Sequence, residues 1–202
     1  MTALLTMGLD PLIAALCIVA TVLGALYKAA PALLTYGTER GGPMFAVPRG
    51  IVLFLGALCF IVFLTEGAIL DWSAVFLVSN RGLEPSIAGL GYASFAAAMT
   101  VGRLTGDAIV SKLGGVRVVA LGGLCAAAGM IVSLGIDGWA ASLIGYALVG
   151  AGCSNIVPVL FTAVGRQQRM PQAVAFPAVI SMGYAGILVG PVFIGAVAHL
   201  ST

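Results

Sequence analysis

Long apolar runs separated by short polar stretches dominate the pattern along the chain, and six such segments can be marked out. They cover residues 11–27, 50–78, 86–104, 118–136, 139–164 and 173–198. A helix needs about 20 apolar residues to cross a hydrocarbon core of about 30 Å, which is the order of these lengths. A transmembrane barrel would instead show segments of about 10 residues that alternate apolar and polar. The pattern therefore predicts an all-α protein, a polytopic transmembrane helical bundle of about six spanning helices.

The composition supports this prediction and excludes several other classes. Of the 202 residues, 61% are hydrophobic and only 8% are charged, whereas soluble domains carry about 25% charged residues. So little charge cannot cover a soluble globule, which excludes a soluble single-domain enzyme, a disordered tail and a coiled coil. The nine Lys and Arg form no basic stripe, so nucleic acid is not an expected partner. The expected surroundings are the lipid bilayer.

No residue set typical of catalysis or cofactor binding stands out. The four cysteines lie inside apolar segments without C-x-x-C spacing, so neither a disulfide framework nor a metal site is expected. The single histidine, His199, lies at the end of the last segment, where an interfacial position is expected. Because a catalytic triad, a zinc-protease motif and a Gly-rich phosphate loop are all missing, we expect no enzymatic activity and no cofactor.

The basic residues predict the orientation of the helices. Eight of the nine fall in connections on one side of a six-helix zigzag, and Arg81 alone falls on the other side. The eight are Lys28, Arg40, Arg49, Arg103, Lys112, Arg117, Arg166 and Arg169. Lys and Arg favour cytoplasmic loops, so we expect these connections inside the cell and both termini outside.

Two acidic residues, Glu66 and Asp71, interrupt the second apolar segment. A charge at the bilayer centre costs about 2.5–3.5 kcal/mol on insertion scales, so such a side chain faces a bundle interior or a wet cavity, or is protonated. The two positions are about 7.5 Å and about 140° apart on a helix, so the carboxyl groups do not share a face. Two interpretations stay open for Glu66 and Asp71. The side chain could contact the solute or relay a proton, or it could make a structural hydrogen bond to a neighbouring helix. The interfacial Trp72 beside Asp71 favours the structural interpretation there.

The last two segments hold further polar and helix-bending positions. In the fifth, Asn155 is an amide that must find partners in the bilayer, and Pro158 predicts a kink. In the sixth, Tyr184 is polar, and Gly190 with Pro191 predicts a second flexible point. Together with Glu66, these residues predict a polar path between helices, like the broken helices that line transporter cavities.

Small residues recur at a spacing of four positions in two segments. Ser94, Ala98, Gly102 and Gly106 do so in the third, and Gly186 and Gly190 in the sixth. This spacing lets two helices approach closely in lipid. Close helix packing is expected on these faces, and smooth faces of this kind also let helices rock during transport.

One stretch of sequence points to a family. Gly102-Arg103-Leu-Thr-Gly106-Asp107, followed by Lys112-Leu-Gly114-Gly, resembles the loop signature between helices eight and nine of major facilitator superfamily transporters. Asp107 could pair with Arg103 four positions earlier, or could cap a helix. The family often has a basic residue after this Asp, and here it is Ala108. This departure puts a full charge relay in doubt.

The resemblance extends from residue 48 onward. The stretches 66–73, 155–161 and 183–191 look like helices seven, ten and eleven of a bacterial branch related to fucose-type sugar permeases. By this resemblance, residues 1–27 correspond to the family's helix six, 28–49 to its central cytoplasmic loop, and 50–202 to a C-terminal bundle of helices seven to eleven. The chain would then be an incomplete C-terminal portion, lacking helices one to five and twelve. The expected location is the bacterial inner membrane, as a multi-pass protein.

The resemblance implies transport of a small solute by alternating access, with two bundles rocking about a midplane site. Glu66 and Asn155 are the expected lining residues, with Glu66 a candidate proton carrier, and the loop 102–114 is the expected conformational latch. The expected partners are the solute, with protons as a candidate co-substrate, and the missing transporter half. The alternative is a non-transporting membrane module, or an inactive fragment, that assembles with partner helices through its small-residue faces.

Overall fold

The computed structural model describes residues 13, 16, 19–21, 23–24, 27–28 and 48–200. Contacts divide the chain into two units, Met1–Gly41 and Gly42–Thr202. In the first unit every described residue is helical, and all but Lys28 fall in the first predicted segment. The other residues of that segment, and most of the predicted connector 28–49, lie outside the described residues.

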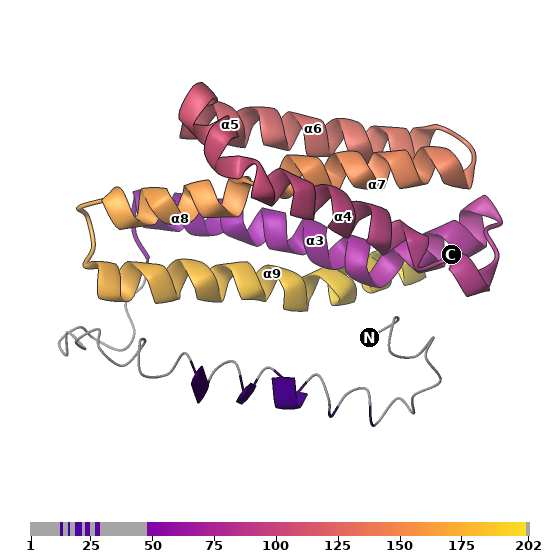
Figure 1. Ribbon diagram of the computed structural model, residues 1–202, viewed down its shortest axis with the longest axis horizontal. Helices are drawn as coiled ribbons and strands as arrows, with labels where there is room; N and C mark the ends of the chain where they lie inside the picture. The colour runs from indigo at the N-terminus through magenta and orange to yellow at the C-terminus, as the bar shows by residue number, and fades with distance from the viewer. Residues whose placement is uncertain are drawn as a thin grey trace. The chain divides into compact units, whose positions relative to one another are not determined.

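The second unit is a bundle of helices (Figure 1). In chain order these are α3 (Ile51–Arg81), the 3-10 turn η1 (Pro85–Ile87), α4 (Leu90–Leu104), α5 (Gly106–Leu113), α6 (Gly115–Gly135), α7 (Trp139–Cys153), α8 (Ile156–Arg166) and α9 (Gln172–Leu200). The described part of the chain contains no β-strand. The predicted all-α fold is therefore confirmed.

Four stretches of the described residues are long and apolar enough to cross a membrane. They are Ile51–Arg81, Gly115–Gly135, Trp139–Arg166 and Gln172–Leu200. The third predicted segment differs, because its helix α4 has only 15 residues and stops at Leu104. The chain bends at Thr105 and continues at once as α5. The segment is thus one part of a longer, bent helical stretch.

The span from α7 to α8 is interrupted at Ser154 and Asn155. Pro158 explains the position of this break. A proline lacks the N–H that would bond to the residue four places earlier, and its ring clashes with that residue's carbonyl group. Here that residue is Ser154, so the helix stops there and restarts at Ile156. By contrast, α9 runs without interruption through Pro177 and Pro191.

The bend between α4 and α5 packs against the break between α7 and α8. A methyl group on Gly102 would lie 2.7 Å from Cβ of Ser154, and one on Gly106 would lie 3.1 Å from Cγ of Asn155. Neither glycine therefore has room for a side chain. The predicted close packing at these positions is present, and the two glycines of the sequence motif are the positions that allow the two bends to meet.

Close approach also characterises two helix pairs. A methyl group on Gly129 of α6 would lie 2.5 Å from the carbonyl oxygen of Gly145 of α7. On α9, Gly186 lies against the backbone of Phe60 of α3. Large apolar side chains on the outer faces are exposed instead, as Ile131 of α6 and Leu188 of α9 show. At these contacts small residues let the helices approach closely, as helix packing in lipid favours.

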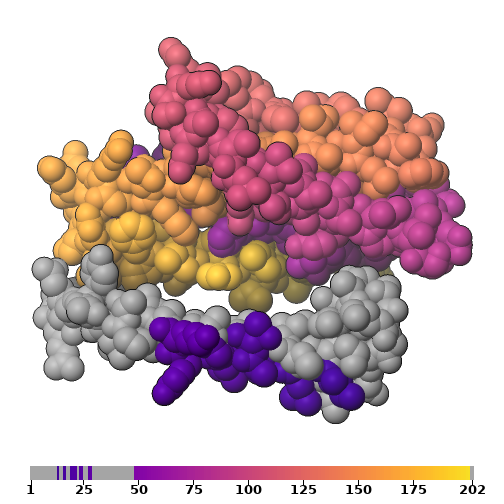
Figure 2. Space-filling view, viewed as in Figure 1, coloured from indigo at the N-terminus to yellow at the C-terminus, as the bar shows by residue number. Residues whose placement is uncertain are grey.

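Basic residues gather at one end of the second unit. Its described Lys and Arg residues, apart from Arg81, lie just before α3, in the last turn of α4, in α5, in the first turn of α6, or at or after the end of α8. In Figure 1, α5, the end of α8 and the start of α9 lie at the left, and the α6–α7 turn lies at the right. The same view in Figure 2 shows α5 protruding from one edge of the unit. The structure thus places these basic residues at one end of the unit, and the cytoplasmic location of that end stays a prediction.

Arg81, the basic residue predicted on the other side, holds α3 to the α6–α7 turn. Its Nη2 donates to the carbonyl oxygens of Ser133 (3.2 Å) and Leu134 (2.8 Å). Its Nη1 lies 2.8 Å from Oδ1 of Asp137, and its guanidinium lies 5.0 Å from the Phe76 ring centre. Carbonyl groups in the last turn of a helix have no partner within the helix, and a cation there is favourable. The side chain therefore serves a local structural contact.

Alanine should have different effects at a glycine in the contact between the two bends and at a glycine that faces open space. Gly106→Ala would push a methyl group into Asn155, so it should lower the melting temperature, at a cost of about 1–3 kcal/mol. Gly123→Ala on α6 is the matched control, because its methyl group would enter open space. Alanine there should keep or raise stability. Thermal unfolding by circular dichroism in detergent tests this, and equal melting temperatures for the two variants would contradict the packing.

The contacts of Arg81 predict an asymmetry within its ion pair. The Arg81 side chain is 10% exposed, whereas that of Asp137 is fully exposed. Arg81→Met removes the side-chain donor to the Leu134 carbonyl group and leaves that of Ser133 with the Ser142 hydroxyl group, so it should clearly lower the melting temperature. Asp137→Asn should change it little, since water replaces an exposed partner. If Asp137→Asn destabilised the protein as much as Arg81→Met, the carbonyl contacts would not be the main interaction.

Candidate functional site

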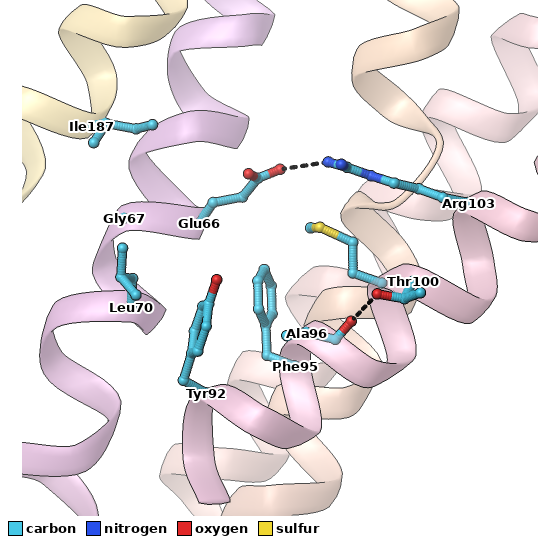
Figure 3. A pocket seen from close by; sticks show the side chains of 10 residues that line it. Glu66, Gly67, Leu70, Tyr92, Phe95, Ala96, Thr100, Arg103 and Ile187 are labelled. Carbon is cyan, nitrogen blue, oxygen red and sulfur yellow. Dashed lines mark hydrogen bonds and ion pairs between the residues drawn. The ribbon is translucent and has the colours of Figure 1, made fainter. Parts of the chain in front are cut away.

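A cavity of about 310 Å³ lies among α3, α4 and α9 (Figure 3). Its lining is mostly apolar and aromatic, with a few polar groups, which is the usual make-up of a small-molecule site. The lining residues are Glu66, Gly67 and Leu70 of α3; Tyr92, Phe95, Ala96, Met99, Thr100 and Arg103 of α4; and Ile187 of α9.

Glu66 and Arg103 face each other across this cavity (Figure 3). Glu66 is about halfway along the 31 residues of α3. Its Oε1 lies 4.0 Å from Nη2 of Arg103, which is an ion pair but too long for a hydrogen bond. Oε1 is buried and has no hydrogen-bond partner among the described residues. The carboxylate is therefore stabilised by a nearby charge and still has room for a donor.

The α4 wall presents one polar and aromatic face to the cavity. Tyr92 extends from α4 with its hydroxyl group on the side of Glu66 (Figure 3). The rings of Tyr92 and Phe95 lie 6.0 Å apart, centre to centre. The hydroxyl group of Thr100 donates to the carbonyl group of Ala96 at 2.8 Å. A solute here would meet one carboxylate, one guanidinium, the hydroxyl group of Thr100, the phenol of Tyr92 and the ring of Phe95.

Sequence reasoning missed most of this wall. It named Arg103 as part of a loop signature and did not single out Tyr92, Phe95, Met99 or Thr100. A signal was present, because Tyr92, Met99 and Arg103 follow the spacing of one helix face. The apolar composition of the segment hid that face, since a buried helix in lipid is apolar on all sides.

Arg103 pairs with Glu66 and does not pair with Asp107 as the four-residue spacing would allow. The α4–α5 bend at Thr105 separates the two positions, so they are not on one continuous helix. Asp107 instead lies in the first turn of α5 and Lys112 in its last turn, where each charge suits the helix dipole. Gly114 connects α5 to α6 with φ of 79°, in the left-handed region that favours glycine.

Asn155 lies at the bend contact and does not line the cavity described above. Its side chain is buried at the α7–α8 break. Nδ2 donates to the carbonyl oxygen of Gly102 (2.9 Å) and to Oγ of Ser154 (3.1 Å). Asn155 thus binds the turn of α4 that carries Arg103. The amide nitrogen is therefore hydrogen-bonded, as its position in an apolar span requires.

The other predicted path residues lie apart from the cavity. Asp71, the residue after Leu70 on α3, is exposed. Tyr184 is 58% exposed on α9, and its ring meets the edge of Phe63 at 5.7 Å between centres. Gly190 packs against Leu64 of α3. Within the described part of the chain, no group of three or more His, Cys, Asp or Glu side chains could hold a metal ion.

Comparisons with known proteins identify relatives of the chain by sequence. The chain is 51% identical, over all 202 residues, to an uncharacterized MFS-type transporter of Yersinia pestis, of which it covers 53%. It is 35% identical over 148 residues (73% of the chain and 36% of the relative) to the membrane protein MosC of Rhizobium meliloti. It is also 30% identical over 164 residues (81% of the chain and 44% of the relative) to an uncharacterized transporter of Sinorhizobium fredii.

The chain spans about half the length, or less, of these curated relatives. No protein-family model matches the chain, and no solved structure gives a significant match. The relatives' names, the membrane-length apolar helices and the all-helical bundle agree with the resemblance seen in the sequence. The chain therefore belongs to the major facilitator superfamily, as a multi-pass protein of the cell membrane.

Proposed function

We propose that the chain is part of a secondary transporter that moves a small solute across the membrane by alternating access. The observation that carries this proposal is the cavity among α3, α4 and α9, in which the Glu66 carboxylate has an oxygen atom without a hydrogen-bond partner among the described residues. A half-satisfied carboxylate inside an apolar bundle is costly, which favours a functional role. The names of the relatives also support a transport function.

Within this proposal, residues 1–27 supply the family's helix six, 28–49 the central cytoplasmic loop, and 50–202 helices seven to eleven. A site at the midplane of such a transporter lies between two bundles, so the remaining helices would supply its other wall. Glu66 contacts the solute or carries a proton. Asn155, Asp71 and Tyr184 act outside the cavity, with Asn155 holding the motif of residues 102–106 in place.

The proposed cavity should be reachable by water, whereas the outer face of α9 should not. In a variant whose four cysteines are replaced by alanine, Thr100→Cys should react with a charged, membrane-impermeant methanethiosulfonate reagent. The control is Leu188→Cys, at a position on α9 that is 73% exposed. Its thiol should face lipid and stay unreactive in lipid vesicles. Thiols react as thiolates, which lipid suppresses. Equal lack of reaction at both positions would count against a solute pathway at α4.

Replacement of the carboxylate should remove proton coupling. A chimera in which this chain replaces the matching half of the Yersinia pestis relative can be assayed for uptake of radiolabelled small solutes, sugars first. For a solute that accumulates, Glu66→Gln should abolish accumulation driven by a proton gradient, because glutamine cannot exchange a proton. Glu84→Gln, at an exposed position before η1, is the control.

Two results of this assay would argue against parts of the proposal. If the pH dependence of uptake were the same in Glu66→Gln, Glu66 would not carry the proton. If a correctly inserted chimera accumulated none of the solutes, the non-transporting membrane module would be the better interpretation.

A further inference from the structure

The cavity is wedge-shaped between α3 and α4. Near the start of α4 the two helices touch, since a methyl group on Gly91 would lie 2.8 Å from Cδ1 of Leu77 and 3.1 Å from Cβ of Ser73. Near the end of α4 the cavity separates them, and the ion pair of Glu66 with Arg103 spans it (Figure 3). This pair is a polar contact between the last turn of α4 and α3.

The same turn of α4 is the acceptor for the α7–α8 break. Gly102, next to Arg103, accepts the hydrogen bond from Asn155 Nδ2 at 2.9 Å and packs directly on the Ser154 side chain. One turn of helix thus carries the contact to the cavity on one residue and the contact to the break on its neighbour. A movement of this turn would therefore change both the ion pair with Glu66 and the hydrogen bond from Asn155.

The ion pair is loose enough to be exchanged. At 4.0 Å it lacks a direct hydrogen bond, and the Arg103 side chain is 51% exposed, so water can solvate it when it leaves. Glu66 is less free, with its side chain 19% exposed. A bound group that donates to Glu66, or neutralises it, competes directly with Arg103 for the carboxylate.

We infer that Arg103 is a positioning residue that transmits the occupancy of Glu66 to the α7–α8 break. When a solute takes the Glu66 carboxylate, Arg103 is released and the last turn of α4 is no longer held to α3. Asn155 then loses its fixed acceptor on Gly102, and the break opens more often. This inference rests on the proposed function, and it gives the loop signature of the family a connection to the cavity in this chain.

Hydrogen–deuterium exchange of the full chain in lipid nanodiscs tests the inference. Glu66→Gln and Arg103→Gln should each speed exchange of the amides of residues 154–157 and 159 by about fivefold, the scale that one partly exposed ion pair contributes to an equilibrium. The double variant should exchange no faster than either single variant, because both remove one interaction. Arg103→Lys keeps the charge and should stay near the unmodified chain.

Two controls separate this coupling from a general loss of stability. Residues 139–149 of α7, in the same span, should exchange at an unchanged rate in all variants. Lys112→Gln removes a cation of α5 outside the pair and should leave residues 154–159 unchanged. Unchanged exchange in both single variants, additive effects in the double variant, or equal acceleration of residues 139–149 and 154–159 would each overturn the inference.

The outcome is independent of the transport assay. If exchange at the break responds as expected but Glu66→Gln leaves solute uptake intact, the coupling exists and the proposed role of Glu66 in transport fails. If uptake depends on Glu66 but exchange at the break does not respond, the transport proposal stands and this inference fails.

Discussion

The ion pair of Glu66 with Arg103 is the interaction on which the account of this protein depends. A carboxylate halfway along an apolar helix is expensive in lipid unless a cation or a wet cavity accompanies it. Here both are present, because Arg103 lies 4.0 Å away and a cavity of about 310 Å³ surrounds the pair. Close contacts elsewhere in the second unit position α3, α4 and α9 around this cavity.

Close contacts without large side chains provide that support. In lipid, apolar burial does not drive helices together, so packing of small residues and interhelical hydrogen bonds must do so. Gly186 brings α9 against α3, and Gly102 and Gly106 bring the α4–α5 bend against Asn155. At the other end, Arg81 ties α3 to the last carbonyl groups of α6. Close contacts therefore hold the helices that border the cavity. The ion pair of Glu66 with Arg103 is a looser contact between two of them.

Sequence reasoning predicted the helical class and most element positions, and it singled out Glu66, which lines the cavity, because apolar run length and misplaced charge are local signals. It also predicted close packing at Gly102 and Gly106. It did not predict that Asn155 would meet these two glycines, since the partners are about 50 residues apart and only the packing of α4 on α7 brings them together. It also placed Arg103 in a loop. In the structure α4 continues to Leu104, and Arg103 lines the cavity. Long-range partners of this kind have no signature in a single sequence.

A double-mutant cycle on Glu66 and Arg103 tests the central claim most directly. The free energy of unfolding of the chain in detergent would be measured for Glu66→Gln, Arg103→Gln and the double variant. If the two side chains form the interaction that spans the cavity, their effects are non-additive, with a coupling energy of about 0.5 kcal/mol or more. Additive effects, with a coupling energy indistinguishable from zero, would contradict the account.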